Sequence, residues 1–451
     1  MKAVKIIAVV LVAALIAAAG VLIGIDYAKD DGVAPPADIV SSNLIAEEYP
    51  DYKNDVYLEK GDDPDLNELG LFWCREVSPG VIEMVPADTA EGAALVDPSK
   101  PTVINVHGMM TDGYYRIEDY VFNNVIGSSE EFGYDGAVVP YDTLQTLWIW
   151  LDKGWNVGVY NWHRFVSEGV DFAAIEAKVW STDGPANVRW RSSDGKYHDD
   201  PVEYSLAELF VGDYLRALEL LDDDFGKEEI RFTAHSMGGE LVSAAAFLLY
   251  EISEGESAQI SADKLPDRMT MDDTFFGAYL QVGDNLFDIS AKGLSVRWTG
   301  KDMPDDRTGR AVIEAIQYLA QKGVVIEYYT YNSSFLNLAI PADDRQILLD
   351  SSVYILADPN YVNPDYGEYS LLTDGHVALR KYSQCSICRA YPGGEMSDAE
   401  KVAYANALPT TELKKLVGKA FLMTGGASTL TTADDVFEEI SHAEIMEKAK
   451  K

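Results

Sequence analysis

The chain has little positive charge for its length. It carries 36 lysine and arginine residues against 74 aspartate and glutamate residues, which gives a formal net charge of −38 over 451 residues. An anionic surface repels nucleic acid and anionic membranes, so we expect no nucleic-acid partner. One explanation of the negative charge is that it keeps the protein soluble. A more specific explanation is adaptation to a salt-rich or calcium-rich habitat.

Several other signatures are missing. The sequence has no internal repeat, no collagen-like or coiled-coil period and no low-complexity tract. The acidic run Asp222–Asp224 lacks the spacing of an EF-hand loop, so we predict no metal site there. With 47% apolar residues, the chain is long enough to bury a sizeable core.

The N-terminus carries an apolar segment. Lys2 and Lys5 precede an uncharged run from Ile6 to Ile25, which is the pattern of a secretory signal. A run of about 20 residues also suffices to cross a bilayer. Residues 1–25 are therefore a signal peptide or a signal anchor, and the positive flank predicts that the rest is secreted or held outside the cytoplasm.

Cysteine is scarce, with three residues: Cys74, Cys385 and Cys388. In an exported monomer an odd number leaves at least one unpaired. The last two form a C-x-x-C pair, but two ligands make a poor zinc site and no thioredoxin-like context surrounds them. A structural disulfide is favoured, and its partners stay open.

The rest of the chain divides by composition and pattern. Residues 26–65 are acidic, contain proline and are predicted to be a linker. Strands and helices alternate over 66–390, which predicts one α/β domain with a mostly parallel sheet and helices on both faces. Residues 164–204 interrupt the alternation as an insertion and are a candidate lid. Residues 391–451 are predicted to be a polar, partly helical extension.

Apolar patterns and caps predict individual elements within that domain. The clearest are an antiparallel pair at 71–77 and 81–87, strands at Thr102–Val106 and Trp155–Asn161, a helix opened by a capping box at Ser205, a helix at Gly239–Tyr250, a helix at Thr308–Lys322 stopped by Gly323, and a candidate last strand at 353–358.

The strongest chemical signal is Ala234-His235-Ser236-Met237-Gly238-Gly239, between an apolar strand and an alanine-rich helix. This is the setting of a nucleophile elbow, a tight turn that exposes a serine hydroxyl at the end of a sheet. The turn needs small residues two before and two after the serine, and Ala234 and Gly238 fill these places. We therefore predict Ser236 as a nucleophile.

A serine nucleophile needs backbone N–H groups that receive the developing oxyanion. Met237 follows the serine at the helix start and is predicted to supply one. The second is expected from the loop after the first parallel strand, His107-Gly108-Met109, with Met109 as donor. Gly108 lets this loop turn sharply, and the His107 ring is expected to brace it.

The general base is expected after the nucleophile in chain order. His376, in a polar loop after the last expected strand, meets this condition and is the predicted base. The other histidines precede the serine, adjoin it or lie in the charged tail: His107, His163, His198, His235 and His442. His235, next to the serine, is expected to point elsewhere.

The acid that orients the base should stand at a strand end between Ser236 and His376. Asp273, at the end of the strand after the elbow helix, is the first candidate, and the alternatives are Asp272, Asp284 and Asp358. The strand VVIEYYTYN ends in Asn332-Ser333 and not in an aspartate, which disfavours the commonest other placement.

Three motifs resemble those of the lipase class of α/β-hydrolases, especially the pancreatic-type lipases. TVINVHGMM resembles the strand and oxyanion loop, GWNVGVYNW a second strand, and RMTMDDTFF the acid segment, which favours Asp273. Asn161 stands where aspartate is usual, and Thr274 where proline is usual. The resemblance covers roughly residues 70–380, and secreted lipase-like proteins of unicellular eukaryotes are candidates for the closer match.

The resemblance implies hydrolysis of carboxylic esters, including lipid acyl esters, without a dissociable organic cofactor. The implied partner is a lipid or small ester substrate, met in some cases at a lipid–water interface, and the oligomeric state stays open. Two alternatives remain. One is a non-catalytic relative that binds lipid or another surface molecule, and the other is a serine peptidase on the same fold.

Overall fold

The structure is a computed structural model. It describes residues 51–78, 81–109, 146–168, 171–199, 202–254, 258–277, 279–282, 285–288, 291–296, 301–331, 340–358, 376, 379, 386–387, 390–426 and 434–448. The apolar segment 1–25, Cys385, Cys388 and Asp284 lie outside these residues.

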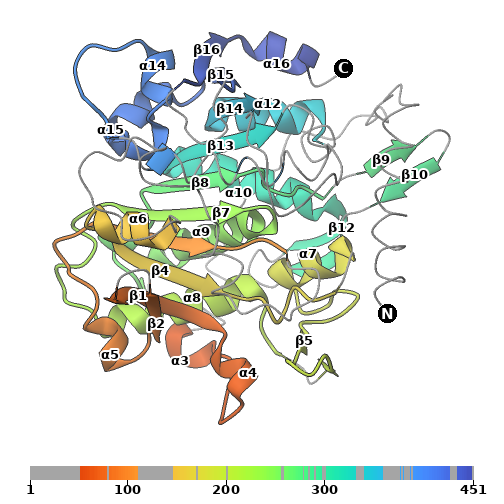
Figure 1. The fold of residues 1–451 in the computed structure, drawn as a ribbon. Coiled ribbons are helices and arrows are strands. Elements are labelled where there is room, and N and C mark those ends of the chain that lie inside the picture. The colour runs from red at the N-terminus through yellow and green to blue at the C-terminus, as the bar shows by residue number, and fades with distance from the viewer. Residues whose placement is uncertain are drawn as a thin grey trace.

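Strands and helices alternate through the described chain (Figure 1). The strands of the central sheet are β1 (Gly70–Ser78), β2 (Val81–Pro86), β3 (Thr102–Val106), β4 (Asn156–Asn161), β7 (Ile230–His235), β8 (Arg268–Asp272), β13 (Val325–Tyr331), β14 (Val353–Asp358), β15 (Ala420–Thr424) and β16 (Val436–Ile440). Three small antiparallel pairs are β5 (Trp190–Arg191) with β6 (Tyr197–His198), β9 (Tyr279–Val282) with β10 (Asn285–Asp288), and β11 (Lys292–Val296) with β12 (Lys301–Arg307).

The helices are α3 (Tyr52–Asp55), α4 (Pro64–Asn67), α5 (Ala90–Ala93), α6 (Thr146–Asp152), α7 (Phe172–Trp180), α8 (Leu206–Glu219), α9 (Met237–Glu254), α10 (Thr308–Lys322), α12 (Ala342–Ser351), α14 (Asp398–Val402), α15 (Thr410–Leu413) and α16 (His442–Lys448). Short 3-10 turns are η2 (Ala262–Lys264), η4 (Ala405–Ala407) and η5 (Lys414–Leu416).

The sheet has ten strands in the order β16-β15-β14-β13-β8-β7-β3-β4-β1-β2. The strands from β15 to β4 run parallel, whereas β1, β2 and β16 pair antiparallel with their neighbours. After β3 the chain forms β4 on one side and later β7 on the other. The order of strands therefore reverses at β3, which is where open α/β sheets bind their ligands.

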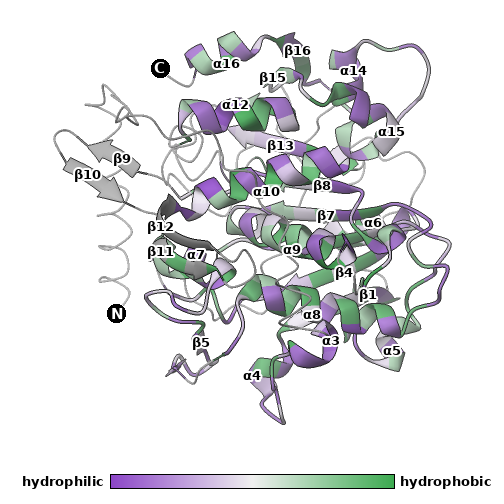
Figure 2. Cartoon of the chain, turned by 180° about the vertical axis from the view of Figure 1, so that it is seen from behind, coloured by the Kyte–Doolittle hydropathy of each residue, from purple (hydrophilic) through white to green (hydrophobic). Residues whose placement is uncertain are grey.

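Helices cover both faces of the sheet, as the sequence predicts for this fold class. On one face α3, α8, α9, α10, α12 and α16 lie in a row, each in contact with the next (Figure 2). On the other face α6 packs over β3 and β4, and the segment from α14 to η5 packs over β13 to β15. The side chains of β13 alternate between the two faces of the sheet. Ile326 and Tyr328 pack in the main core, whereas Val325 and Tyr329 pack with the segment from α14 to η5.

The predicted elements with strong patterns are confirmed. β3 and α10 have the expected bounds, and Gly323 ends α10 in the left-handed region at φ 97°. Ser205 and Glu208 form the capping box of α8. This long buried helix has its apolar stripe against the sheet, which explains why its position could be read from spacing alone.

The ends of the domain extend further than the pattern indicated. The strand at 353–358 is not the last, because β15 and β16 continue the sheet. They lie within 391–451, where a polar extension is expected, and the edge strand β16 is mostly exposed. Within the acidic segment 26–65, Tyr52 and Val56 are fully buried beside α8. β16 is a short edge strand with mostly exposed side chains, so it gives little apolar signal in the sequence.

The insertion 164–204 contains α7, β5 and β6. Residues Ala174 to Trp180 of α7 are buried, and the helix packs against α8, α9 and α10. Lys178 is also buried and donates to the carbonyls of Phe165 and Arg189 at 2.8 Å each. This helix is therefore part of the core layer and does not form a surface lid by itself.

Candidate active site

The predicted nucleophile lies on a tight turn between β7 and α9. Ser236 has φ 57°, a left-handed conformation that non-glycine residues rarely adopt. Its N–H donates to the Asp272 carbonyl at 3.0 Å, and its own carbonyl accepts from Gly239 N–H at 2.9 Å. The surrounding strands thus hold a strained backbone, as expected of a strand-to-helix elbow.

Asp273 continues β8, which is the parallel neighbour of β7. Because His235 pairs with Asp272 in register, Ser236 and Asp273 leave the sheet side by side. Asp273 also has positive φ, at 43°, and its N–H donates to the Tyr329 carbonyl at 2.8 Å. One carboxylate oxygen, Oδ1, accepts from Thr330 Oγ1 at 3.1 Å.

His376 contacts the other oxygen of this carboxylate. Its Nδ1 lies 2.7 Å from Asp273 Oδ2, and the aspartate is buried while the histidine side chain is 21% exposed. The carboxylate only accepts, so Nδ1 carries the proton and Nε2 is the basic nitrogen. A histidine oriented in this way can take a proton from a neighbouring hydroxyl.

The other candidate acids are placed differently. Asp272 contributes its main-chain carbonyl to the elbow, as described above. Asp358 ends β14, which is separated from β8 by β13.

The loop after β3 approaches the elbow closely. A side chain at Gly108 would place its first carbon 2.7 Å from Ser236 Cβ and 2.8 Å from the His235 carbonyl. A side chain at Gly238 would lie 2.5 Å from the His107 carbonyl. Glycine is therefore required at both places for the two backbones to meet.

The two predicted oxyanion donors flank this contact. Met237 is the first residue of α9 and is buried, and the N–H groups of a first helical turn have no acceptor within the helix. Met109 follows Gly108 and is partly buried against the core. The two residues thus come from the start of α9 and from the loop after β3, whose Gly108 approaches Ser236.

His107 braces the loop after β3. Its Nδ1 donates to the Gly108 carbonyl at 2.8 Å, and its Nε2 accepts from Trp162 N–H at 3.2 Å. The ring stacks on Trp162, with centroids 5.6 Å apart. Burial lowers the pKa of His107 to about 4, so the ring is neutral at pH 7.

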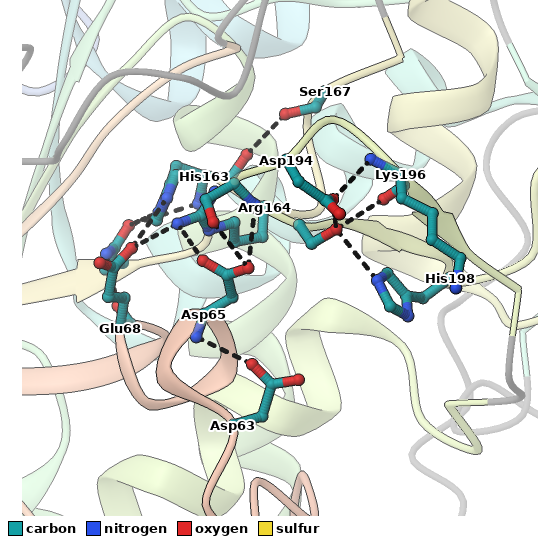
Figure 3. Close-up of polar contacts among 12 residues, drawn as sticks. Asp63, Asp65, Glu68, His163, Arg164, Ser167, Asp194, Lys196 and His198 are labelled. Atoms are coloured by element: carbon teal, nitrogen blue, oxygen red, sulfur yellow. Dashed lines mark hydrogen bonds and ion pairs between the residues drawn. The ribbon is translucent and has the colours of Figure 1, made fainter.

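Further polar contacts lie between Asn161 and the N-terminal segment, and Figure 3 shows those of His163, Arg164, Asp65 and Glu68. His163 Nδ1 lies 2.9 Å from Asn161 Oδ1, and Arg164 Nη2 donates to Asp65 and Glu68, each at 2.7 Å. Burial, together with the charge of Arg164, lowers the pKa of His163 to about 3. Asn161, which lies 3.3 Å from His107 Nε2, and Arg164, which contacts Asp65 and Glu68, thus join the loop after β3 to the segment around α4.

Two contacts at the site were not expected from the sequence. Thr330 supports Asp273 from the neighbouring strand, and the His235 ring lies against His376 although it was expected to point elsewhere. The first contact depends on the register between β8 and β13, and the second on how a segment distant in the chain packs against β7. A single sequence states neither. The only local signal was that Thr330 is near the end of a strand.

The remaining chemical candidates are accounted for within the described residues. Cys74 is free and buried, and burial raises the pKa of its thiol, which disfavours the reactive thiolate. No group of three or more His, Cys, Asp or Glu side chains in the described part could hold a metal ion. In the same part, no helix is long and apolar enough to cross a membrane.

Comparisons with known proteins find distant structural similarities and no relative by sequence. No family model and no curated protein matches the chain. A metagenome-derived lipolytic enzyme is similar at 11% identity and TM-score 0.25, over 56% of this chain and 80% of that one. A thioesterase domain from the curacin biosynthetic pathway is similar at 13% identity and TM-score 0.23, with the same coverage. The α/β-hydrolase fold itself is seen in the sheet, in which a serine elbow follows a central parallel strand.

Proposed function

We propose that the protein is a serine hydrolase that cleaves carboxylic esters through an acyl-enzyme. The observation that carries the proposal is the bond between His376 Nδ1 and Asp273 Oδ2, 2.7 Å long, beside the strained turn at Ser236. These residue types occur here in the chain order Ser, Asp, His, which is that of α/β-hydrolase triads.

In the proposed mechanism, Ser236 Oγ attacks the ester carbonyl and His376 Nε2 takes its proton. Asp273 keeps the imidazole in the required tautomer and stabilises its positive charge. The N–H groups of Met109 and Met237 receive the oxyanion of the tetrahedral intermediate. His376 then protonates the leaving alcohol, and a water molecule hydrolyses the acyl-enzyme.

The substrate class follows from the resemblance of the motifs to lipases, and we propose a lipid or other acyl ester. We also propose that residues 1–25 export the chain, which leaves it secreted or anchored with the hydrolase domain outside the cytoplasm. N-terminal sequencing of the mature protein would separate these cases: a start near residue 26 means cleavage, and an intact N-terminus means an anchor.

The first test compares the full-length protein with Ser236→Ala on p-nitrophenyl esters from acetate to palmitate and with a fluorophosphonate probe. We expect the variant to lose about a thousandfold or more in kcat, as is typical of a triad nucleophile. Ser243→Ala is a matched control, because Ser243 is likewise a buried serine; it lies within α9 and donates to the Gly239 carbonyl at 2.7 Å.

The outcomes separate the candidate functions. Ester hydrolysis that depends on Ser236, with a preference for long acyl chains, supports a lipase, and a preference for acetate supports an esterase. A folded wild-type protein that neither hydrolyses esters nor reacts with the probe contradicts the proposal and favours the binding-only relative. Probe labelling with turnover of peptides but not esters favours a peptidase.

A further inference from the structure

The residue before the nucleophile has contacts that the proposed mechanism does not use. His235 is the last residue of β7 and is 7% exposed. Its side chain lies on the sheet face opposite Ala234, which enters the main core. The ring therefore extends toward the side from which His376 approaches the site.

One nitrogen of His235 contacts the main chain of His376. The distance from His235 Nε2 to the His376 carbonyl oxygen is 3.1 Å. A carbonyl oxygen can only accept, so Nε2 carries the proton and donates it. This contact joins two residues that are 141 positions apart in the chain.

The ring of His235 also has two close neighbours. It lies against the His376 ring, with centroids 4.3 Å apart and planes at 39°. On the oxyanion side, a carbon added to Gly108 would lie 3.4 Å from His235 Nδ1. His235 therefore lies between the loop after β3 and the histidine that would act as base.

We propose that His235 is a positioning residue for the reaction: it fixes the main chain of His376, while Asp273 fixes the ring. This inference rests on the proposed function, since it assigns His235 a part in orienting the base toward Ser236. Two fixed points define the direction of Nε2 better than one, because the bond to Asp273 alone leaves the backbone of residue 376 free to shift around it. A small misplacement of the base lowers the rate without changing substrate contacts.

Three substitutions distinguish the effect of the hydrogen bond on the rate from the effect of the volume of the ring. His235→Gln places an amide N–H near the position of Nε2, so the donor is kept. His235→Asn is polar as well, but its amide is too short and corresponds to Nδ1. His235→Phe keeps the ring and removes the donor.

We expect kcat of the Asn and Phe variants to fall about tenfold with KM unchanged, which corresponds to the loss of one hydrogen bond. His235→Gln should stay within about twofold of wild type. The remote control is His442→Phe, because His442 Nε2 also bonds a main-chain carbonyl, that of Gly418, at 2.9 Å. This control should leave kcat unchanged.

A spectroscopic measurement tests the positioning without catalysis. The Nδ1 proton of His376, held by Asp273, should give a low-field NMR resonance that Asp273→Asn removes. We expect the resonance to persist in His235→Gln and to broaden or shift in the Asn and Phe variants. Thermal unfolding of each variant identifies any that fails to fold, and the remaining ones still decide the question.

The failures are distinguishable. If wild type reacts with neither ester nor probe, the proposed function fails, and the resonance alone decides whether His235 holds His376. If wild type is active, and His235→Asn and His235→Phe keep both the wild-type kcat and the unchanged resonance, the positioning role is overturned.

Discussion

Glu327 and Glu240 are both fully buried, yet their carboxyl groups are stabilised in different ways on opposite faces of the sheet. Glu327, on β13, faces the C-terminal segment and accepts from Arg268 Nε and from Thr270 Oγ1, both at 2.7 Å. Its charge has a buried counter-charge. Glu240, on α9, faces α7 and the carboxyl group of Glu176.

No arginine or lysine of the described residues acts on the Glu176–Glu240 pair. Trp180 Nε1 donates to Glu240 Oε2 at 3.3 Å, and Ala291 N–H donates to Glu176 Oε2 at 3.2 Å. The two carboxyl groups are neighbours in a buried environment, so the charge on one disfavours ionisation of the other. Burial raises the pKa of Glu176 to about 7, and burial with the charge of Glu176 raises the pKa of Glu240 well above its ordinary value.

The comparison shows two ways to bury a carboxyl group: pairing with a cation, or retention of a proton. The first joins the C-terminal segment to the sheet, because the same Arg268 donates to the carbonyls of Leu408 and Ala405. The second way joins α7, which belongs to the insertion, to α9, the helix that follows Ser236. The first link should therefore depend on the arginine, and the second on pH.

The largest expected effect comes from removing the cation. Arg268→Met leaves the Glu327 charge buried and unpaired, and we expect the free energy of unfolding to fall by about 3–5 kcal/mol. Urea denaturation at pH 7 measures it. The double variant Arg268→Met with Glu327→Met removes both charges and should recover part of the loss. A single variant as stable as wild type would show that the pair is not the main stabilisation of Glu327.

Such side-chain pairs also show how far the sequence could predict the molecule. The bounds of β3 and α10 followed from a buried apolar run and from a helix with a glycine stop. Ser236 was chosen from its place between strand and helix, and the structure places Asp273 beside it and in contact with His376. These inferences needed only local pattern and chain order.

What the sequence did not indicate depends on contacts between distant segments. Glu327 and Glu240 look alike in a sequence, since each is one acidic residue in an apolar element. Their partners are set by strand register and by the packing of α7 on α9. The same limit hid the contact between His235 and His376, and it hid the packing of α7 on α9 within the insertion 164–204, which was predicted as a candidate lid.

The second prediction concerns pH and the Glu176–Glu240 pair. Because the pKa of Glu176 rises from 4.5 to about 7 on folding, the folded state keeps a proton that the unfolded state releases. The contribution of this proton to the free energy of unfolding is fully present below pH 4.5. It is lost as the pH rises through 7, at about 1.4 kcal/mol per pH unit for each proton. Glu176→Gln supplies an amide donor in place of that proton, so we expect its unfolding free energy to depend less on pH.

Urea denaturation of wild type and Glu176→Gln at steps from pH 5 to pH 8 measures this difference. The double variant at Arg268 and Glu327 is the matched control, because it changes the other buried carboxyl and should keep the wild-type pH slope. If Glu176→Gln has the same slope as wild type, the pair does not retain a proton in the folded state.

The smallest expected effect tests the side-chain donor from Trp180 to Glu240. Trp180→Phe removes the Nε1–H that Glu240 Oε2 accepts, while most of the ring stays in the core. We expect a loss of about 1 kcal/mol in unfolding free energy. In the Glu240→Leu background there is no acceptor, so the same substitution should cost less, and the difference is the coupling between the two side chains. Equal costs in both backgrounds would mean that the indole stabilises α7 through packing and not through its hydrogen bond to Glu240.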